Sequence, residues 1–115
     1  MDLFECGAVL FESDEDGETL RIECAVTGEG GLDFLQESEG PLTEWSFEET
    51  PHRIEVSVPP IGAMNLATYF HLDMVTQLPA VLRLEYVGYD CFIRIRALMR
   101  RLEIPYCVVE APIVR

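Results

Sequence analysis

The spacing of apolar residues changes at Pro59 and Pro60, and this change constrains the fold more than any other feature of the sequence. Before the two prolines, apolar and polar residues alternate over short stretches, which is typical of β-strands with one buried face. After them, apolar residues recur mostly three or four positions apart, which is typical of amphipathic helices. Strands followed by helices predict an α+β domain, in which two helices pack on one face of a mainly antiparallel sheet.

Two alternating stretches, residues 3–12 and 19–27, flank a short acidic segment near the N-terminus. They predict an antiparallel hairpin with a solvated acidic tip. Placing Leu10 opposite Leu20 makes one face of this hairpin wholly apolar, as a half-buried sheet requires. A shift by one residue would destroy that match, so we expect this register.

The rest of the chain predicts further strands and two helices. Strands are expected at residues 42–49, 53–58, 80–87 and 106–110. Helices are expected at residues 64–78, ended by Pro79, and at residues 90–103, with Asp90 as the N-cap. The glycine-rich residues 28–41 predict a loop with a short extended piece at residues 32–35. The strand, helix and strand between residues 80 and 110 permit a C-terminal βαβ crossover, and residues 1–115 are expected to form a single domain.

Charge is distributed unevenly along the chain. Residues 1–58 carry 16 Asp and Glu against two arginines, a net charge of −14, whereas residues 59–115 carry five acids and six arginines, a net charge of +1. The acidic half repels nucleic acid and anionic membranes and attracts basic surfaces. We therefore expect neither direct nucleic-acid binding nor membrane association. The second half holds one basic cluster, which we expect to pair with acids on an exposed helix face: Arg94, Arg96, Arg100 and Arg101.

No arrangement of residues in the sequence predicts catalysis. No Gly-x-Ser-x-Gly segment frames a serine, and no cysteine has a basic neighbour. His52 is expected at a turn, and His71 is expected inside the helix of residues 64–78 as a packing or boundary residue. Cys and His lack the close pairs that zinc requires, and the acidic tip lacks the ligand positions of a calcium loop. The glycine-rich segment at residues 28–31 is flanked by acids that would repel phosphate. We expect no enzyme activity, no metal and no cofactor.

The cysteines and the apolar runs indicate a cellular compartment. Cys6, Cys24, Cys91 and Cys107 lie far apart without a Cys-x-x-Cys pair or a secretory signal, so reduced thiols are expected. The hairpin register above places Cys6 beside Cys24 on the buried face. The longest apolar runs are shorter than the roughly 20 residues of a membrane span. We expect a cytoplasmic protein.

The acidic half supplies the candidate binding residues. Carboxylates at strand spacing can imitate the phosphate row of nucleic acid, and aromatic residues among them would serve as anchors, because such residues dominate binding hot spots. The candidate partner-binding residues are Asp14, Glu15, Asp16, Glu18, Asp33, Glu37, Glu44, Trp45, Phe47 and Glu48. The alternative interpretation is a solvated acidic surface with a half-buried tryptophan.

These features favour a small acidic, non-enzymatic inhibitory protein that covers a basic groove of a nuclease, a CRISPR effector or a toxin. In size, acidity and lack of catalytic motifs, the chain resembles bacterial immunity proteins, antitoxins and phage-encoded anti-CRISPR or DNA-mimic proteins. This resemblance covers no motif that assigns a role to a residue. One alternative is an acidic assembly or chaperone-like subunit that acts through an exposed sheet face, or as a homodimer through its last strand. A small enzyme that uses Asp73 or Glu85 in an apolar pocket is a third interpretation.

Overall fold

The computed structural model describes residues 7–47 and 51–112. The strands are β1 (Gly7–Glu15), β2 (Glu18–Val26), β3 (Leu32–Glu39), β4 (His52–Val58) and β5 (Cys107–Pro112). The helices are α1 (Pro41–Phe47), α2 (Pro60–Tyr69), the short 3-10 helix η2 (Val75–Gln77), α3 (Leu78–Glu85) and α4 (Cys91–Arg101).

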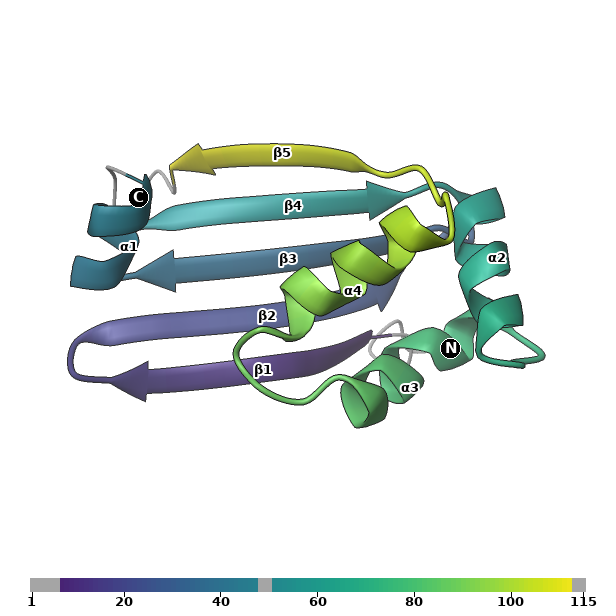
Figure 1. Ribbon diagram of the computed structural model, residues 1–115, viewed down its shortest axis with the longest axis horizontal. Coiled ribbons are helices and arrows are strands. Elements are labelled where there is room, and N and C mark those ends of the chain that lie inside the picture. Colours follow the sequence, from purple (N-terminus) through teal and green to yellow (C-terminus); the bar gives the residue numbers. More distant parts are fainter. Residues whose placement is uncertain (1–6, 48–50, 113–115) are drawn as a thin grey trace.

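All five strands belong to one antiparallel sheet, in the order β1-β2-β3-β4-β5 (Figure 1). Each strand therefore pairs with the next strand along the chain, and α2, α3 and α4 are inserted between β4 and β5. This arrangement confirms the predicted α+β class, with a mainly antiparallel sheet that begins with the N-terminal hairpin.

One face of the sheet carries helices. α4 crosses this face, α3 packs against β1 and β2, and α1 and α2 lie at opposite ends of the sheet (Figure 1). The core between the layers includes Phe34 of β3 and Phe92 of α4, whose ring centroids are 5.6 Å apart and whose side chains are fully buried. No described helix covers the opposite face, which we call the open face.

The N-terminal hairpin forms in a register that differs from the predicted one. Asp16 and Gly17 both have positive φ, 54° and 77°, and form a two-residue turn with type I′ geometry. This tight turn extends both strands into the segment predicted to be a solvated tip, and β1 accommodates the change with a bulge. Leu20 consequently lies opposite Ser13, and the predicted pairing of Leu20 with Leu10 is wrong.

The segment after β2 also differs from the prediction. β3 runs through residues expected to form a loop, because alternate side chains such as Phe34 are buried while the acids between them face solvent. Residues 42–49 were predicted as a strand, but residues 42–47 belong to α1 and the last two lie outside the described part of the chain. Gly40, with φ of 136°, ends β3, and Pro41 begins the helix, where its missing N–H is not needed.

The first helix of the second half is shorter than predicted. α2 ends at Tyr69 rather than at residue 78. His71 adopts a left-handed φ of 59°, and the N–H of Leu72 donates to the carbonyl of Ala67 across the helix end. This is the hydrogen-bond pattern of a Schellman termination, so the chain turns there and begins a new helix beyond it.

α3 replaces the strand predicted at residues 80–87. Leu78 and Leu82, four positions apart, are fully buried, and Pro79 lies in the first helical turn, where proline is tolerated. Without that strand no parallel crossover forms, and β5 pairs antiparallel with β4. The helix predicted at residues 90–103 and the strands predicted at residues 53–58 and 106–110 are confirmed as α4, β4 and β5.

Candidate functional site

The open face of the sheet is strongly acidic. Because strand side chains alternate between the two faces, the residues between buried positions point to the open face. The acids at these positions are Glu12, Asp14, Glu23, Asp33, Glu37, Glu39 and Glu55, and the bases are Arg21 and Arg53. The sheet thus gathers acids from four strands on a surface that the described helices leave uncovered.

Neighbouring carboxylates hold both arginines of the open face. Arg21 lies directly opposite Glu12, and its Nε is 3.2 Å from Oε2 of Glu23. Hydrogen bonds to Glu23 and Glu12 raise the pKa of the Arg21 guanidinium. Arg53 pairs with Glu55 on its own strand. These charges are exposed, so the pairs contribute little to stability, and they neutralise only part of the acidic surface.

Three carboxylates of the open face form no ion pair with the residues that the structure describes: Asp14, Asp33 and Glu37. Asp14 lies near the hairpin turn, and the other two lie on the central strand β3. Adjacent strands are about 4.8 Å apart, and the register places Glu37 directly opposite both Arg21 and Arg53. The seven acids and two arginines therefore form a mixed array with an excess of negative charge. Such an array attracts a basic surface through its net negative charge.

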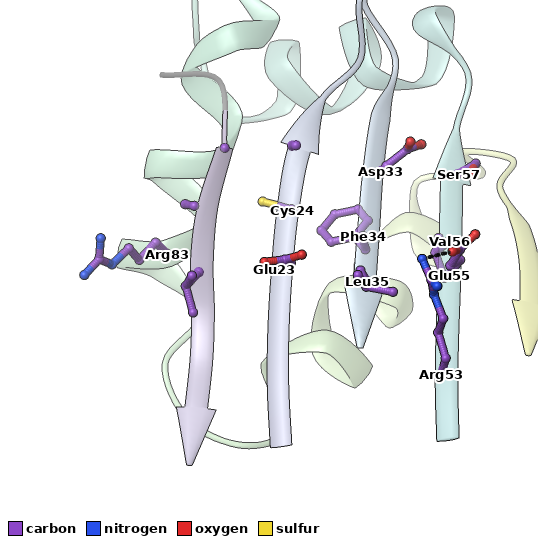
Figure 2. Close-up of a pocket in the computed structure, with 14 residues that line it drawn as sticks. Glu23, Cys24, Asp33, Phe34, Leu35, Arg53, Glu55, Val56, Ser57 and Arg83 are labelled. Carbon is purple, nitrogen blue, oxygen red and sulfur yellow. Dashed lines mark ion pairs between the residues drawn. The ribbon is translucent and has the colours of Figure 1, made fainter. Parts of the chain in front are cut away.

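A shallow hollow lies in the open face (Figure 2). Its volume is about 760 Å³, and the residues that line it include the small residues Gly7 and Ala25. Glu23, Asp33 and Glu55, from three adjacent strands, also line it. Arg53 and Arg83 also line the hollow, so its three carboxylates are partly offset. The small residues leave space for the aliphatic stem of a lysine or arginine side chain from a partner, and the carboxylates suit its charged head.

The hairpin and α1 are joined at one end of the sheet. The Glu18 carboxylate accepts hydrogen bonds from the backbone N–H groups of Leu42 (2.8 Å) and Thr43 (3.2 Å), and from the Thr43 hydroxyl. These bonds hold the N-terminus of α1 against the hairpin, so α1 and the hairpin turn share one end of the molecule (Figure 1). Leu42 and Trp45, three positions apart on α1, are both exposed, Trp45 to 84%.

The predicted partner-binding residues fall into two groups. Those on the open face are Asp14, Asp33 and Glu37. Those at the hairpin end are Glu15, Asp16, Glu44 and Trp45, which together with Leu42 we call the tip surface. Glu18 is engaged in capping α1, Phe47 is the last residue of that helix, and Glu48 lies outside the described residues. Trp45 is exposed on a helix, not half-buried on a strand.

Sequence reasoning missed several members of these surfaces. Glu23 and Glu55 each stand between two buried strand residues, so the alternation itself was a signal that they face the open side. Leu42 was missed because its segment was predicted as a strand, in which position 42 is not aligned with Trp45. No sequence signal indicated the Glu18 cap, because its partners Leu42 and Thr43 are more than twenty positions away along the chain.

The described thiols and imidazoles lie in different environments, and Cys91 is near enough to Cys24 to help raise the pKa of its thiol. Cys24 lies opposite Ala8, not opposite Cys6 as predicted, and burial raises the pKa of its thiol to about 12. His52 is buried at the start of β4, and His71 is exposed at the end of α2. Within residues 7–47 and 51–112, no group of His, Cys, Asp or Glu is placed to hold a metal ion. In the same residues, no helix is long and apolar enough to cross a membrane.

The arginines of α4 lie in the helical layer. Arg94 pairs with Asp90 at 3.3 Å, as expected for a solvated helix. Arg96 instead lies over the Tyr106 ring, 5.9 Å from its centroid, and Arg100 donates a hydrogen bond of 3.0 Å to the Tyr106 hydroxyl. Burial opposes the ionisation of Tyr106, but the two arginines outweigh it and lower the pKa of that hydroxyl.

Charge is therefore segregated in space, with acids on the open face and the tip surface and most arginines in the helical layer. Comparison of the chain with models of protein families, with curated proteins and with solved structures finds no match. The function of the protein is accordingly inferred from the chemistry of its surfaces.

Proposed function

We propose that the protein is a small acidic, non-enzymatic inhibitor that binds the basic groove of a nucleic-acid enzyme or a toxin through its open face and tip surface. The observation that carries this proposal is the array of carboxylates on a sheet face that no described helix covers. Long-range attraction between this array and a basic groove would raise the rate of association. The bound protein would then occlude the groove.

The sheet suits this role because it holds the charges in a fixed arrangement. Antiparallel hydrogen bonding sets the spacing between carboxylates before the partner arrives. A preorganised surface loses less conformational entropy on binding than a flexible acidic loop would lose. The acidic array therefore competes for a groove that normally binds the phosphates of nucleic acid.

The tip surface would add apolar contact to the electrostatic attraction. Leu42 lies beside Asp16 and Glu15, and Trp45 is exposed three positions further along α1, so a partner that meets the tip would contact charge and apolar area together. Tryptophan is enriched among the residues that dominate binding energy. Because charge acts mainly on association and buried contacts mainly on dissociation, Trp45→Ala should speed dissociation with little change in the association rate.

Two variants of equal net charge test the proposal. The open-face variant carries Asp14→Lys, Asp33→Lys and Glu37→Lys. The control variant carries Asp73→Lys, Glu85→Lys and Glu103→Lys, at exposed positions in the helical half. Each variant replaces three acids by three bases, so only the location of the change differs. Glu18 is left intact because it caps α1.

The wild-type protein and both variants are immobilised and exposed to a bacterial lysate at about 100 mM and 500 mM salt, and bound proteins are identified by mass spectrometry. We expect a basic nuclease, toxin or CRISPR component to be retained at low salt by the wild type and the control variant, and lost by the open-face variant and at high salt. The purified component should lose activity when the protein is added. Equal capture by the open-face variant would remove the open face from the proposal, and unchanged activity of the captured enzyme would remove inhibition.

A further inference from the structure

The two edges of the sheet differ in how they are protected against pairing with another strand. β1, at one edge, has a bulge between Val9 and Phe11 and carries three acids within residues 12–15. α3 also packs against it. Bulges, charges and covering helices are the devices by which natural proteins prevent edge-to-edge association.

β5, at the other edge, has fewer of these devices. Its pairing with β4 is regular over residues 107–112, and Glu110 is the one charged residue among them. Cys107, Val108 and Val109 are all exposed, Val109 to 59%. Among the described residues no strand pairs with the outer side of β5, so a row of backbone N–H and C=O groups faces outward there.

We propose that β5 pairs antiparallel with β5 of a second copy of this chain, so that two five-stranded sheets join into one continuous sheet around a twofold axis. Antiparallel pairing of identical strands is an isologous contact, the kind that closes a dimer. It satisfies the outward backbone groups of both copies and removes the exposed edge from each. This inference does not depend on the proposed target.

The proposed register has its twofold axis at Val109. Residues directly opposite in an antiparallel pair have their side chains on the same face of the sheet. In a twofold dimer, the axis therefore passes at a residue that lies directly opposite the same residue of the second copy. An axis at Glu110 would place two carboxylates directly opposite one another, which is unfavourable. An axis at Val109 pairs Val108 with Glu110 of the second copy. It also lets residues 107–111 pair without interruption and stops at Pro112, which has no N–H to donate.

The charge around β5 also fits a second copy. Tyr106, Val108 and Glu110 alternate along the chain on the side of the sheet that faces α4. Arg96 and Arg100 contact Tyr106 on that side, at 5.9 Å from the ring centroid and 3.0 Å from the hydroxyl. The register places Glu110 of the second copy beside Val108, and therefore on the same side as these two arginines. The acidic open face and tip surface would repel a second copy, which confines the contact to this edge.

The axis runs perpendicular to the sheet, so both open faces lie on the same side of the dimer. The two acidic arrays would then lie on the same side of one joined sheet, separated by the paired β5 strands, whose residues on that side are uncharged. A basic partner that meets this side of the dimer would therefore face two open faces instead of one.

Cysteine cross-linking tests the register. Opposite Cα atoms in an antiparallel pair are about 4.5 or 5.5 Å apart, within the range that a disulfide bridges. Val109→Cys in a Cys107→Ser background should therefore form a disulfide-linked dimer on mild oxidation, as seen by non-reducing electrophoresis. Ser46→Cys in the same background is the control, because Ser46 is exposed on α1 and lies outside β5. Equal cross-linking of the two variants would overturn the register.

Sedimentation equilibrium tests the dimer itself. The wild type should dimerise more tightly at 500 mM than at 100 mM salt, because salt screens the repulsion between two acidic copies. Val109→Lys places like charges together at the axis and should weaken dimerisation by about tenfold. Val87→Lys, at an exposed valine outside β5, should leave it unchanged. A wild type that stays monomeric at both salt concentrations overturns the proposal. Target binding has the opposite salt dependence, so the failure of one proposal is distinguishable from the failure of the other.

Discussion

The hydrogen bonds from Glu18 to α1 predict that one substitution detaches the tip surface while the core stays folded. Glu18→Ala removes the acceptor for the N–H groups of Leu42 and Thr43, and loss of such a cap costs about 1 kcal/mol. It also leaves the hydroxyl of the buried Thr43 without its acceptor, at a further cost of about 1 kcal/mol. The free energy of unfolding should therefore fall by about 2 kcal/mol, or about 8 °C in Tm for a domain of this size.

Two measurements resolve the global and the local effect. Urea denaturation followed by circular dichroism gives the change in the free energy of unfolding. Trp45 is the single tryptophan of the chain and lies on α1, so its fluorescence anisotropy reports on this helix alone. We expect lower anisotropy and faster amide exchange at residues 42–47 in Glu18→Ala, because a seven-residue helix is not stable without its tertiary contacts.

Glu15 and a conservative substitution provide the controls. Glu15→Ala removes a carboxylate from the same hairpin but from a side chain that does not cap α1, and it should leave stability within about 0.5 kcal/mol. Glu18→Gln keeps one acceptor oxygen without the charge and should recover about half of the loss. The reasoning is refuted if Glu18→Ala behaves like Glu15→Ala in stability and in the exchange of the α1 amides.

Three further predictions concern the core, a buried thiol and a turn. Phe92→Ala should lower the free energy of unfolding by about 3 to 5 kcal/mol, because the ring is fully buried, and Ile93→Ala on the exposed side of α4 should change it little in the same denaturation experiment. The Cys24 thiol has a pKa of about 12 in the folded protein against 9.0 for an unperturbed thiol, so above pH 9 only the unfolded state loses this proton. This group should therefore lower stability by about 1.4 kcal/mol between pH 8 and pH 10, and a Cys24→Ala variant that showed the same decline would contradict the assignment. Gly40→Ala should lower Tm, because its φ is 136° and the added Cβ would lie 2.7 Å from a backbone carbonyl oxygen of the hairpin turn, whereas Gly28→Ala, with open space around it, should not.

Local patterns in the sequence were sufficient for several elements. In α4, Phe92, Ile95 and Met99 recur at helical spacing, and all are buried against the sheet as that spacing requires. In β4, Ile54 and Val56 alternate with polar residues, and the strand formed where predicted. These elements are long or regular enough that the burial of one face decides their conformation.

Two short segments were assigned the wrong structure because their local patterns fit both a strand and a helix. Residues 80–87 alternate apolar and polar positions, yet the burial of Leu78 and Leu82 on one side of a helix prevails. Residues 42–49 contain aromatic residues that favour strands, but the Glu18 carboxylate accepts hydrogen bonds that only a helix N-terminus can offer there. In both cases the deciding contact comes from residues outside the segment.

Residue order alone was enough to show that the first half is acidic, that it alternates as strands do, and that the fold is α+β. The positions of the acids could not be read from residue order, because they depend on strand register. That register itself depends on the turn at Asp16 and Gly17 and on the bulge in β1. Acids from four strands then face the side of the sheet opposite the helices. Charge sets what such a surface attracts at long range, but backbone pairing sets the spacing at which the charges meet a partner.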